Sequence, residues 1–185
     1  QAGMSGFLFA LLAVFVAGIG ARDQLLVAAL AARHGMRPMA LVVALLCVLA
    51  SGALAAAMAG LALPKMGPIQ RQIFAALALG LAGIEMLFAR KTRIPDEPTH
   101  SLGAFALVLF AQQLLDAARF LIFAIAVATA AHVPAALGGM LGGAGVVSAG
   151  WLASDQLLSR NLAPLRRVVG ALLLALAVWL GISAR

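Results

Sequence analysis

Charges in the middle of long apolar stretches constrain this sequence more than any other feature. Arg22 and Asp23 lie near the middle of one stretch, and Asp116 and Arg119 lie near the middle of another. A charge at the centre of a membrane helix is costly, so such residues usually face the interior of a helix bundle. Two charged clusters at matching places in the two halves therefore indicate a bundle built from two related halves.

The composition is typical of an integral membrane protein. Hydrophobic residues make up 64% of the 185 residues, charged residues make up 10%, and the mean hydropathy is +1.09. Soluble domains have about 45–50% apolar and about 25% charged residues. A chain of this length accommodates about six membrane-spanning helices of roughly 20 residues each, which leaves no room for a separate soluble domain.

Six apolar segments, separated by polar or proline-containing turns, predict an all-α integral membrane fold with six transmembrane helices. The first and fourth segments are longer than a perpendicular span requires, so we expect a tilt or a break in each. We expect residues 1–3, which precede Met4, to be an expression remnant, and residues 4–185 to form a single membrane domain. The segments are 5–32, 39–63, 70–89, 102–131, 134–158 and 165–183.

The order of the segments predicts an internal repeat. The polar segment 91–100 is central, and we expect it to link two three-helix repeats at about 4–90 and 101–185. An offset of about 95 residues places Ala21 on Asp116. Because each half has an odd number of helices, the second repeat is inverted relative to the first, as in many transporters.

The basic residues predict the orientation in the membrane. The turns after the first, third and fifth segments contain eight Lys and Arg residues, whereas the opposite side contains three. The positive-inside tendency places the first set in the cytoplasm and both termini outside. We therefore expect a multi-pass protein of the bacterial inner membrane, and we do not interpret the net charge of +7 as a sign of nucleic-acid binding.

Two short motifs resemble those of a known transporter family. Residues 18–25 read Gly-Ile-Gly-Ala-Arg-Asp-Gln-Leu, and residues 113–120 read Gln-Leu-Leu-Asp-Ala-Ala-Arg-Phe. They are similar to the paired Glu-x-Gly-Asp-Lys/Arg-Ser/Thr motifs of the cation/proton exchangers that include the Golgi manganese-homeostasis transporter and bacterial manganese exporters, within the lysine-exporter superfamily. The resemblance implies six helices in two inverted repeats, and export of Mn²⁺ or Ca²⁺ in exchange for protons.

The carboxylates of the motifs depart from the family pattern. The family's acids are replaced by Gly18 and Ala21 in the first copy and by Gln113 in the second. Asp116 keeps a motif carboxylate, and Asp23 returns one acid two positions late. Two of the four carboxylates that the resemblance implies therefore remain.

The candidate transport site consists of these charges and the amides beside them. Asp23 and Asp116 are the candidate ligands of a cation or proton, because hard divalent cations prefer carboxylate oxygens. Arg22 and Arg119 are candidate counter-ions, which would make the four-residue cluster neutral overall. Three glutamines could add neutral amide oxygens, namely Gln24, Gln112 and Gln113.

Three functions fit these residues. The first is secondary-active export of a divalent cation in exchange for protons, with no cofactor other than the bound cation itself. The two central arginines suit carboxylates, so export of an anionic or zwitterionic solute such as an amino acid stays open. The third is a degenerate, non-transporting scaffold in which the charges form structural ion pairs.

No nucleophile with a neighbouring base stands out in the sequence, so we expect no enzymatic activity. The expected partners are the lipid bilayer and a small ion or solute, and a homo-oligomer stays open. Glu85, about one turn before Arg90, reads as an acid at the membrane interface. The glycines between residues 138 and 145 have the small-xxx-small spacing that favours close helix packing.

Overall fold

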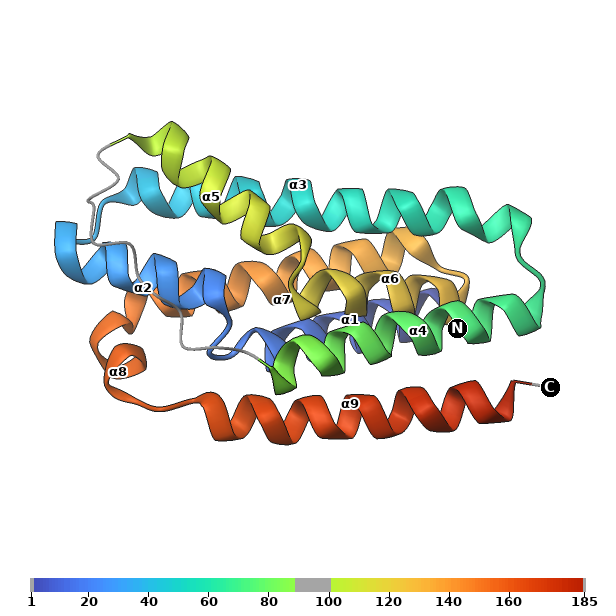
Figure 1. Ribbon diagram of the computed structural model, residues 1–185. Helices are drawn as coiled ribbons and strands as arrows, with labels where there is room; N and C mark the ends of the chain where they lie inside the picture. The colour runs from blue at the N-terminus through green and yellow to red at the C-terminus, as the bar shows by residue number, and fades with distance from the viewer. Residues whose placement is uncertain (1, 89–100, 185) are drawn as a thin grey trace.

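Helices make up nearly all of the structure. The computed structural model describes residues 2–88 and 101–184, and no strand occurs within those ranges (Figure 1). The all-α class expected from the sequence is therefore confirmed for this part of the chain. The elements are α1 (Ala2–Gly18), α2 (Arg22–His34), α3 (Pro38–Ala62), the 3₁₀ turn η1 (Leu63–Lys65), α4 (Pro68–Leu87), α5 (Leu102–Leu114), α6 (Ala117–Thr129), α7 (His132–Leu152), α8 (Ser154–Ser159) and α9 (Ala163–Ser183).

Several helices are long and apolar enough to cross a membrane. Three qualify on their own, namely Pro38–Lys65, α7 and α9. Two more spans arise if each bent pair counts as one, because α2 continues α1 at an angle of 58° and α6 continues α5 at an angle of 50°. Three to five candidate spans in the described residues are compatible with a multi-pass membrane protein, whereas six spans stay a prediction.

The first break, between α1 and α2, depends on Gly20. This residue has a φ of 73°, a conformation that glycine adopts far more readily than other residues. A Cβ atom at Gly20 would lie only 2.8 Å from the Cβ of Leu162, at the start of α9. Local backbone geometry and lack of space therefore both fix the break that the length of the first segment predicted.

The second break, between α5 and α6, contains neither proline nor glycine. Leu115 directly follows α5, and Asp116 directly precedes α6 with an extended backbone. The side chain of Asp116 does not cap α6, although an aspartate at this position commonly does so. The carboxylate is instead directed to the buried contacts described below.

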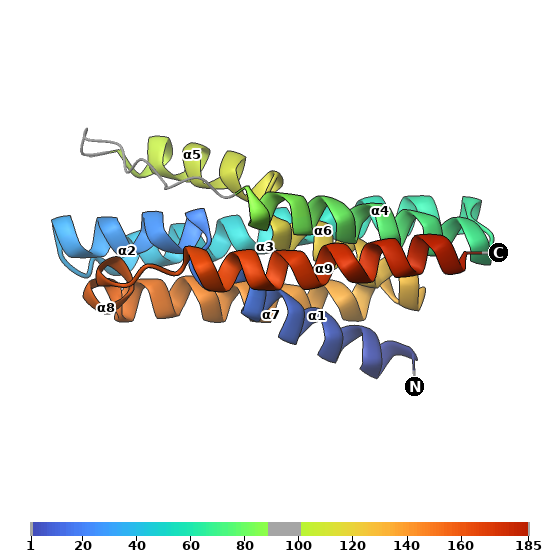
Figure 2. The same ribbon diagram turned by 60° about the horizontal axis from the view of Figure 1, so that its bottom comes forward.

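The second half of the chain repeats the element order of the first at a nearly constant spacing. Helix α6 begins 95 residues after α2, α7 begins 94 residues after α3, and α9 begins 95 residues after α4. Helix α1 packs on α7, as α5 packs on α3, while α4 lies beside α9 (Figures 1 and 2). Both termini lie at one end of the bundle, opposite α8 and the turn between α2 and α3 (Figures 1 and 2).

Small side chains fill the interior, and large apolar side chains cover the outside. Alanine and valine dominate the buried core, whereas Leu61 and Phe88 are each 74% exposed and Leu107 is 72% exposed. Only 17% of the apolar window of α9 is buried. Membrane helices commonly pack through small residues and turn large apolar ones to lipid, which fits this distribution.

The glycines of α7 bring it close to its neighbours, as their spacing predicted. A Cβ atom at Gly138 would strike the carbonyl oxygen of Phe7, and one at Gly142 would lie 2.6 Å from the carbonyl oxygen of Leu11. Helix α7 therefore packs directly against the backbone of α1.

Candidate functional site

The two helix breaks meet at a buried group of polar side chains, which we call the central cluster. None of its members is more than 7% exposed. They come from both halves of the chain: α2, α3, the end of α5, the second break and the first turn of α6. The members are Asp23, Ser51, Gln113, Asp116 and Arg119.

Arg119 is the centre of this cluster. Its Nε and Nη2 atoms donate hydrogen bonds to the hydroxyl oxygen of Ser51 at 2.9 and 2.7 Å. Its Nη1 atom lies 4.0 Å from Oδ2 of Asp23 and 3.8 Å from Oδ2 of Asp116. These last two distances permit ion pairing but exceed the range of a hydrogen bond. One guanidinium group therefore faces two carboxylates without a direct hydrogen bond to either.

Gln113 connects Asp23 to Ser51 within the cluster. Its amide nitrogen donates to Oδ2 of Asp23 at 3.3 Å. Its amide oxygen lies 3.0 Å from the Ser51 hydroxyl, which also lies 2.7 Å from the carbonyl oxygen of Cys47. Because the hydroxyl has one proton, it donates to only one of these acceptors at a time. Gln113 thus joins α5 to α2 and to α3.

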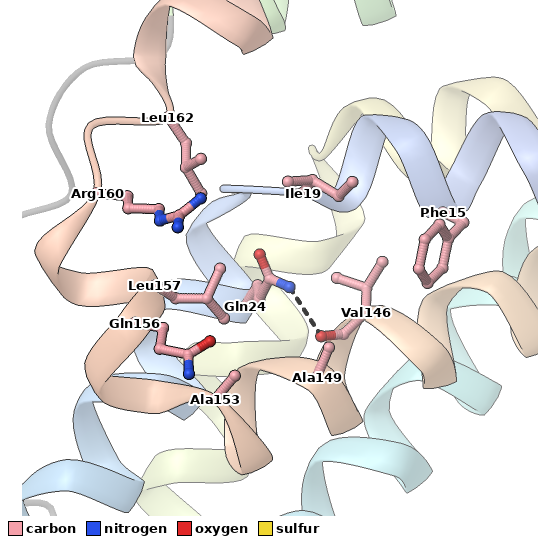
Figure 3. A pocket seen from close by; sticks show the side chains of 10 residues that line it. All are labelled: Phe15, Ile19, Gln24, Val146, Ala149, Ala153, Gln156, Leu157, Arg160 and Leu162. Atoms are coloured by element: carbon pink, nitrogen blue, oxygen red, sulfur yellow. Dashed lines mark hydrogen bonds between the residues drawn. The ribbon is translucent and has the colours of Figure 1, made fainter.

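Asp23 and Gln24 are held by the backbone around the first break. Oδ1 of Asp23 accepts from the backbone N–H of Gln24 at 2.8 Å, in the first turn of α2, where the helix dipole favours a negative charge. Gln24 accepts from the N–H of Gly20 at 2.7 Å and donates to the carbonyl oxygen of Val146 at 3.0 Å (Figure 3). Gln24 therefore holds the break against α7.

Arg22 does not join the central cluster. Its side chain is exposed, and it has no hydrogen bond or ion pair within residues 2–88 and 101–184. The cluster therefore contains the carboxylates of Asp23 and Asp116 but only the one guanidinium of Arg119. With all three ionised, its net charge is −1 rather than the zero expected from the sequence.

A cavity of about 380 Å³ reaches Asp116 from outside the cluster. The amide oxygen of Gln112 is buried and has no hydrogen-bond partner among the described residues. Asp116 thus has the cavity on one side and Arg119 on the other. The lining residues are Arg22, Glu85, Val108, Ala111, Gln112, Leu115 and Asp116.

A second cavity, of about 350 Å³, lies beside the first break. Figure 3 shows the amide of Gln24 within it, directed to Val146, together with Arg160 and the apolar side chains of Phe15 and Ile19. Gln24 belongs to this cavity, and its neighbour Asp23 belongs to the central cluster. The second cavity therefore lies beside the first break, whereas the cavity at Asp116 is lined by a member of the central cluster.

Glu85 differs from the sequence interpretation of an interfacial acid near Arg90, a residue that lies outside the described ranges. Its Oε2 atom is 2.8 Å from Nη2 of Arg166, whose side chain is only 3% exposed. The Nη1 atom of Arg166 donates to the carbonyl oxygen of Ala17 at 2.7 Å, in the last turn of α1. A buried ion pair therefore joins α4 to α9 and to the first break.

The structure brings four of the seven predicted site residues together, namely Asp23, Gln113, Asp116 and Arg119. Gln24 is adjacent to them, while Arg22 and Gln112 line the cavity at Asp116. Sequence reasoning missed Ser51 and the Glu85–Arg166 pair. A signal for the pair was present, because Glu85 is the one acid of the segment 70–89 and Arg166 is the second residue of the segment 165–183.

No group of three or more His, Cys, Asp or Glu side chains is arranged to hold a metal ion within the part of the chain that the structure describes. The carboxylates of Asp23 and Asp116 are the charged oxygen groups of the central cluster. Gln113 and Ser51 add neutral oxygens. A cation bound there would have to compete with the guanidinium of Arg119.

Comparison with known proteins returned no match to a protein-family model, to a curated protein or to a solved structure. The function is therefore argued from the geometry and chemistry of the site.

Proposed function

We propose that this chain is a secondary-active membrane transporter that exports a divalent cation in exchange for protons. The observation that carries the proposal is the central cluster itself, where Asp23 and Asp116 share one arginine at two helix breaks. Ionisable groups buried between membrane helices usually belong to an ion or proton path. Broken helices that meet at such a site are a common device of secondary transporters.

The proposed architecture is six spans in two inverted three-helix repeats, with α4 as the sixth span beside α9. The spacing of 94 or 95 residues between the starts of three pairs of corresponding helices supports it, namely α2 with α6, α3 with α7 and α4 with α9. So do the opposite directions in which α1–α2 and α5–α6 run along the bundle (Figure 1). The basic residues favour a bacterial inner-membrane protein with both termini outside.

The two motifs support membership in the cation/proton exchanger family that they resemble. Residues 18–25 span the first break and residues 113–120 span the second. We infer that the chain is a divergent member, in which Asp23 and Asp116 bind the cation or protons in place of the four carboxylates of the family motifs.

In the proposed mechanism the cation replaces Arg119 as the partner of the two carboxylates. Arg119 is already held by Ser51, so its guanidinium can shift from the carboxylates without losing all of its hydrogen bonds. One divalent cation or two protons change the charge of the cluster equally, so either can balance Asp23 and Asp116. Rocking of one repeat against the other would then expose the site to the opposite side.

The charge of the cluster favours a cation over the anionic or zwitterionic solute. An anion would have to compete with two carboxylates for the one guanidinium of Arg119. Arg22, which would have strengthened an anion site, is turned to the cavity edge. With Asp23, Asp116 and Arg119 all ionised, the net charge of −1 therefore favours a cation.

The test is cation flux in proteoliposomes. We expect Asp116→Asn and Asp23→Asn each to reduce Mn²⁺ or Ca²⁺ flux driven by a proton gradient to the level of protein-free liposomes. The matched control is Asp155→Asn, because Asp155 is exposed on α8, and this variant is expected to transport like the wild type. Unchanged flux in folded Asp116→Asn and Asp23→Asn would overturn the proposal.

A further inference from the structure

Glu85 and Asp116 line the same cavity, although Glu85 belongs to α4 and Asp116 to the second break. Gln112, near the end of α5, lines this cavity as well. Its amide oxygen is buried and has no hydrogen-bond partner among the described residues. The cavity therefore brings two carboxylates, each paired with an arginine, and one amide oxygen to the same space, with the exposed Arg22 also on its lining. Oxygen groups of this kind are the ligands that hard cations prefer.

The cavity is large enough for a partly hydrated ion. Its volume is about 380 Å³. A water molecule occupies about 30 Å³ in the liquid, so the cavity corresponds to on the order of ten water molecules. A divalent cation could therefore contact Glu85 while it keeps most of its own hydration shell.

Glu85 is the open partner of its ion pair. Its side chain is 13% exposed, whereas that of Arg166 is 3% exposed. Arg166 also has a second acceptor, the carbonyl oxygen of Ala17, to which its Nη1 atom donates. If Glu85 turned to a cation, Arg166 would keep this backbone hydrogen bond, which lowers the cost of separating the pair.

The same arginine connects the cavity to the first break. Arg166 on α9 contacts the last turn of α1 at Ala17, and Asp23 follows shortly afterwards at the start of α2. Arg166 thus makes two side-chain contacts, one with Glu85 on α4 and one with the end of α1. Movement of Glu85 away from Arg166 would release the first of them and leave the second, which lies beside the first break.

We propose that Glu85 is the outer cation ligand of the transport path, which takes a divalent cation in exchange for Arg166 and passes it to Asp116. This inference rests on the proposed function and extends it, because it adds a binding step before the central cluster. The alternative is that Glu85 and Arg166 form a purely structural ion pair.

The experiment compares Glu85→Gln with the paired variant Glu85→Gln/Arg166→Gln, as Mn²⁺ flux against Mn²⁺ concentration and as thermal stability. Glu85→Gln alone leaves Arg166 buried without its charge partner, so its stability is expected to fall. The second substitution removes that charge, so the paired variant should regain stability. We expect it nevertheless to show a KM for Mn²⁺ raised roughly tenfold or more, since loss of a group that supports a metal site typically costs 10–100-fold in affinity.

Recovery of both stability and the wild-type KM in the paired variant would overturn the inference, because the pair would then be structural. Asp155→Asn is the matched control for loss of an exposed acid, and Asp116→Asn is measured beside it. If Asp116→Asn abolishes flux while the paired variant transports like the wild type, only the inference about Glu85 fails. If Asp116→Asn retains flux, the proposed function itself fails.

Discussion

The arrangement of hydrogen bonds around Arg119 separates the roles of the two aspartates. Asp23 accepts from the backbone of Gln24 and from the amide of Gln113. The side chain of Asp116 has no hydrogen bond within the described residues and pairs only with Arg119, while its other side lines the cavity. Asp116 is therefore the aspartate that can move to a ligand with the least disruption, and Asp23 is the fixed one.

Ser51 supplies the hydrogen-bond acceptor for the buried guanidinium of Arg119. It accepts two hydrogen bonds from Arg119 and is fully buried. Ser51→Ala removes both bonds, so we expect the free energy of unfolding to fall by about 1–3 kcal/mol, the usual cost of leaving a buried polar group unpaired. Thermal or chemical denaturation in detergent measures this loss.

Ser159→Ala is the matched control for Ser51, because Ser159 is exposed on α8 and its hydroxyl donates only to the backbone of its own helix. Equal stability of the two variants would mean that Arg119 finds other partners.

At the scale of the elements, the helix breaks are what bring the charges into the interior. Gly20 has a φ of 73°, and Gly35 has a φ of 75° with a ψ of 169°, so alanine at either position is strained by about 1–3 kcal/mol. Gly20 also lies against Leu162, whereas a Cβ atom at Gly35 would meet nothing within 4 Å. Gly20→Ala should therefore destabilise the protein more than Gly35→Ala.

Thermal stability of the Gly20→Ala and Gly35→Ala variants measures this difference. Both variants carry strain from a positive φ, and the contact of the first break with Leu162 adds a loss that only Gly20→Ala is expected to show. A Gly20→Ala variant as stable as Gly35→Ala would contradict the close approach of Leu162.

The sequence predicted most helices well because proline marks their starts. The expected segments 39–63 and 165–183 correspond to α3, which begins at Pro38, and to α9, which has proline in its first turn. The expected segment 134–158 was too long, because α7 ends at Leu152 and α8 is separate. The second break could not be located from the sequence, since neither proline nor glycine lies at it.

The sequence identified the charged residues of the candidate site, but it could not show which of their side chains face the interior. Neighbouring residues on a helix point about 100° apart, so Arg22 turns out of the interior when Asp23 faces it. Which of the two faces inward depends on how α2 packs on α7 and α5, and that information is tertiary. The contribution of Ser51 was hidden for the same reason, because a serine in an alanine-rich helix also fits a role in packing.

At the scale of the whole molecule, the near-constant spacing between the halves places the two breaks at corresponding positions, and contacts between Asp23, Gln113 and Arg119 join them. Helices α3 and α7 contact each other between the halves, and so do α4 and α9. The helix contacts of the two halves do not correspond completely. Helix α4 packs on α6, but their counterparts in the other half, α9 and α2, are not among the principal helix contacts of the described residues. Opening of the cluster to the two sides of a membrane would require the interfaces between the halves to slide.

The most direct test of the account is calorimetric titration of Mn²⁺ into the purified protein. The central claim is that Asp23 and Asp116 together hold the transported cation in place of Arg119. The account predicts that the wild type binds Mn²⁺, that Asp155→Asn binds it equally, and that the folded double variant Asp23→Asn/Asp116→Asn does not. Binding of equal affinity and stoichiometry in the wild type and the double variant would contradict the central claim.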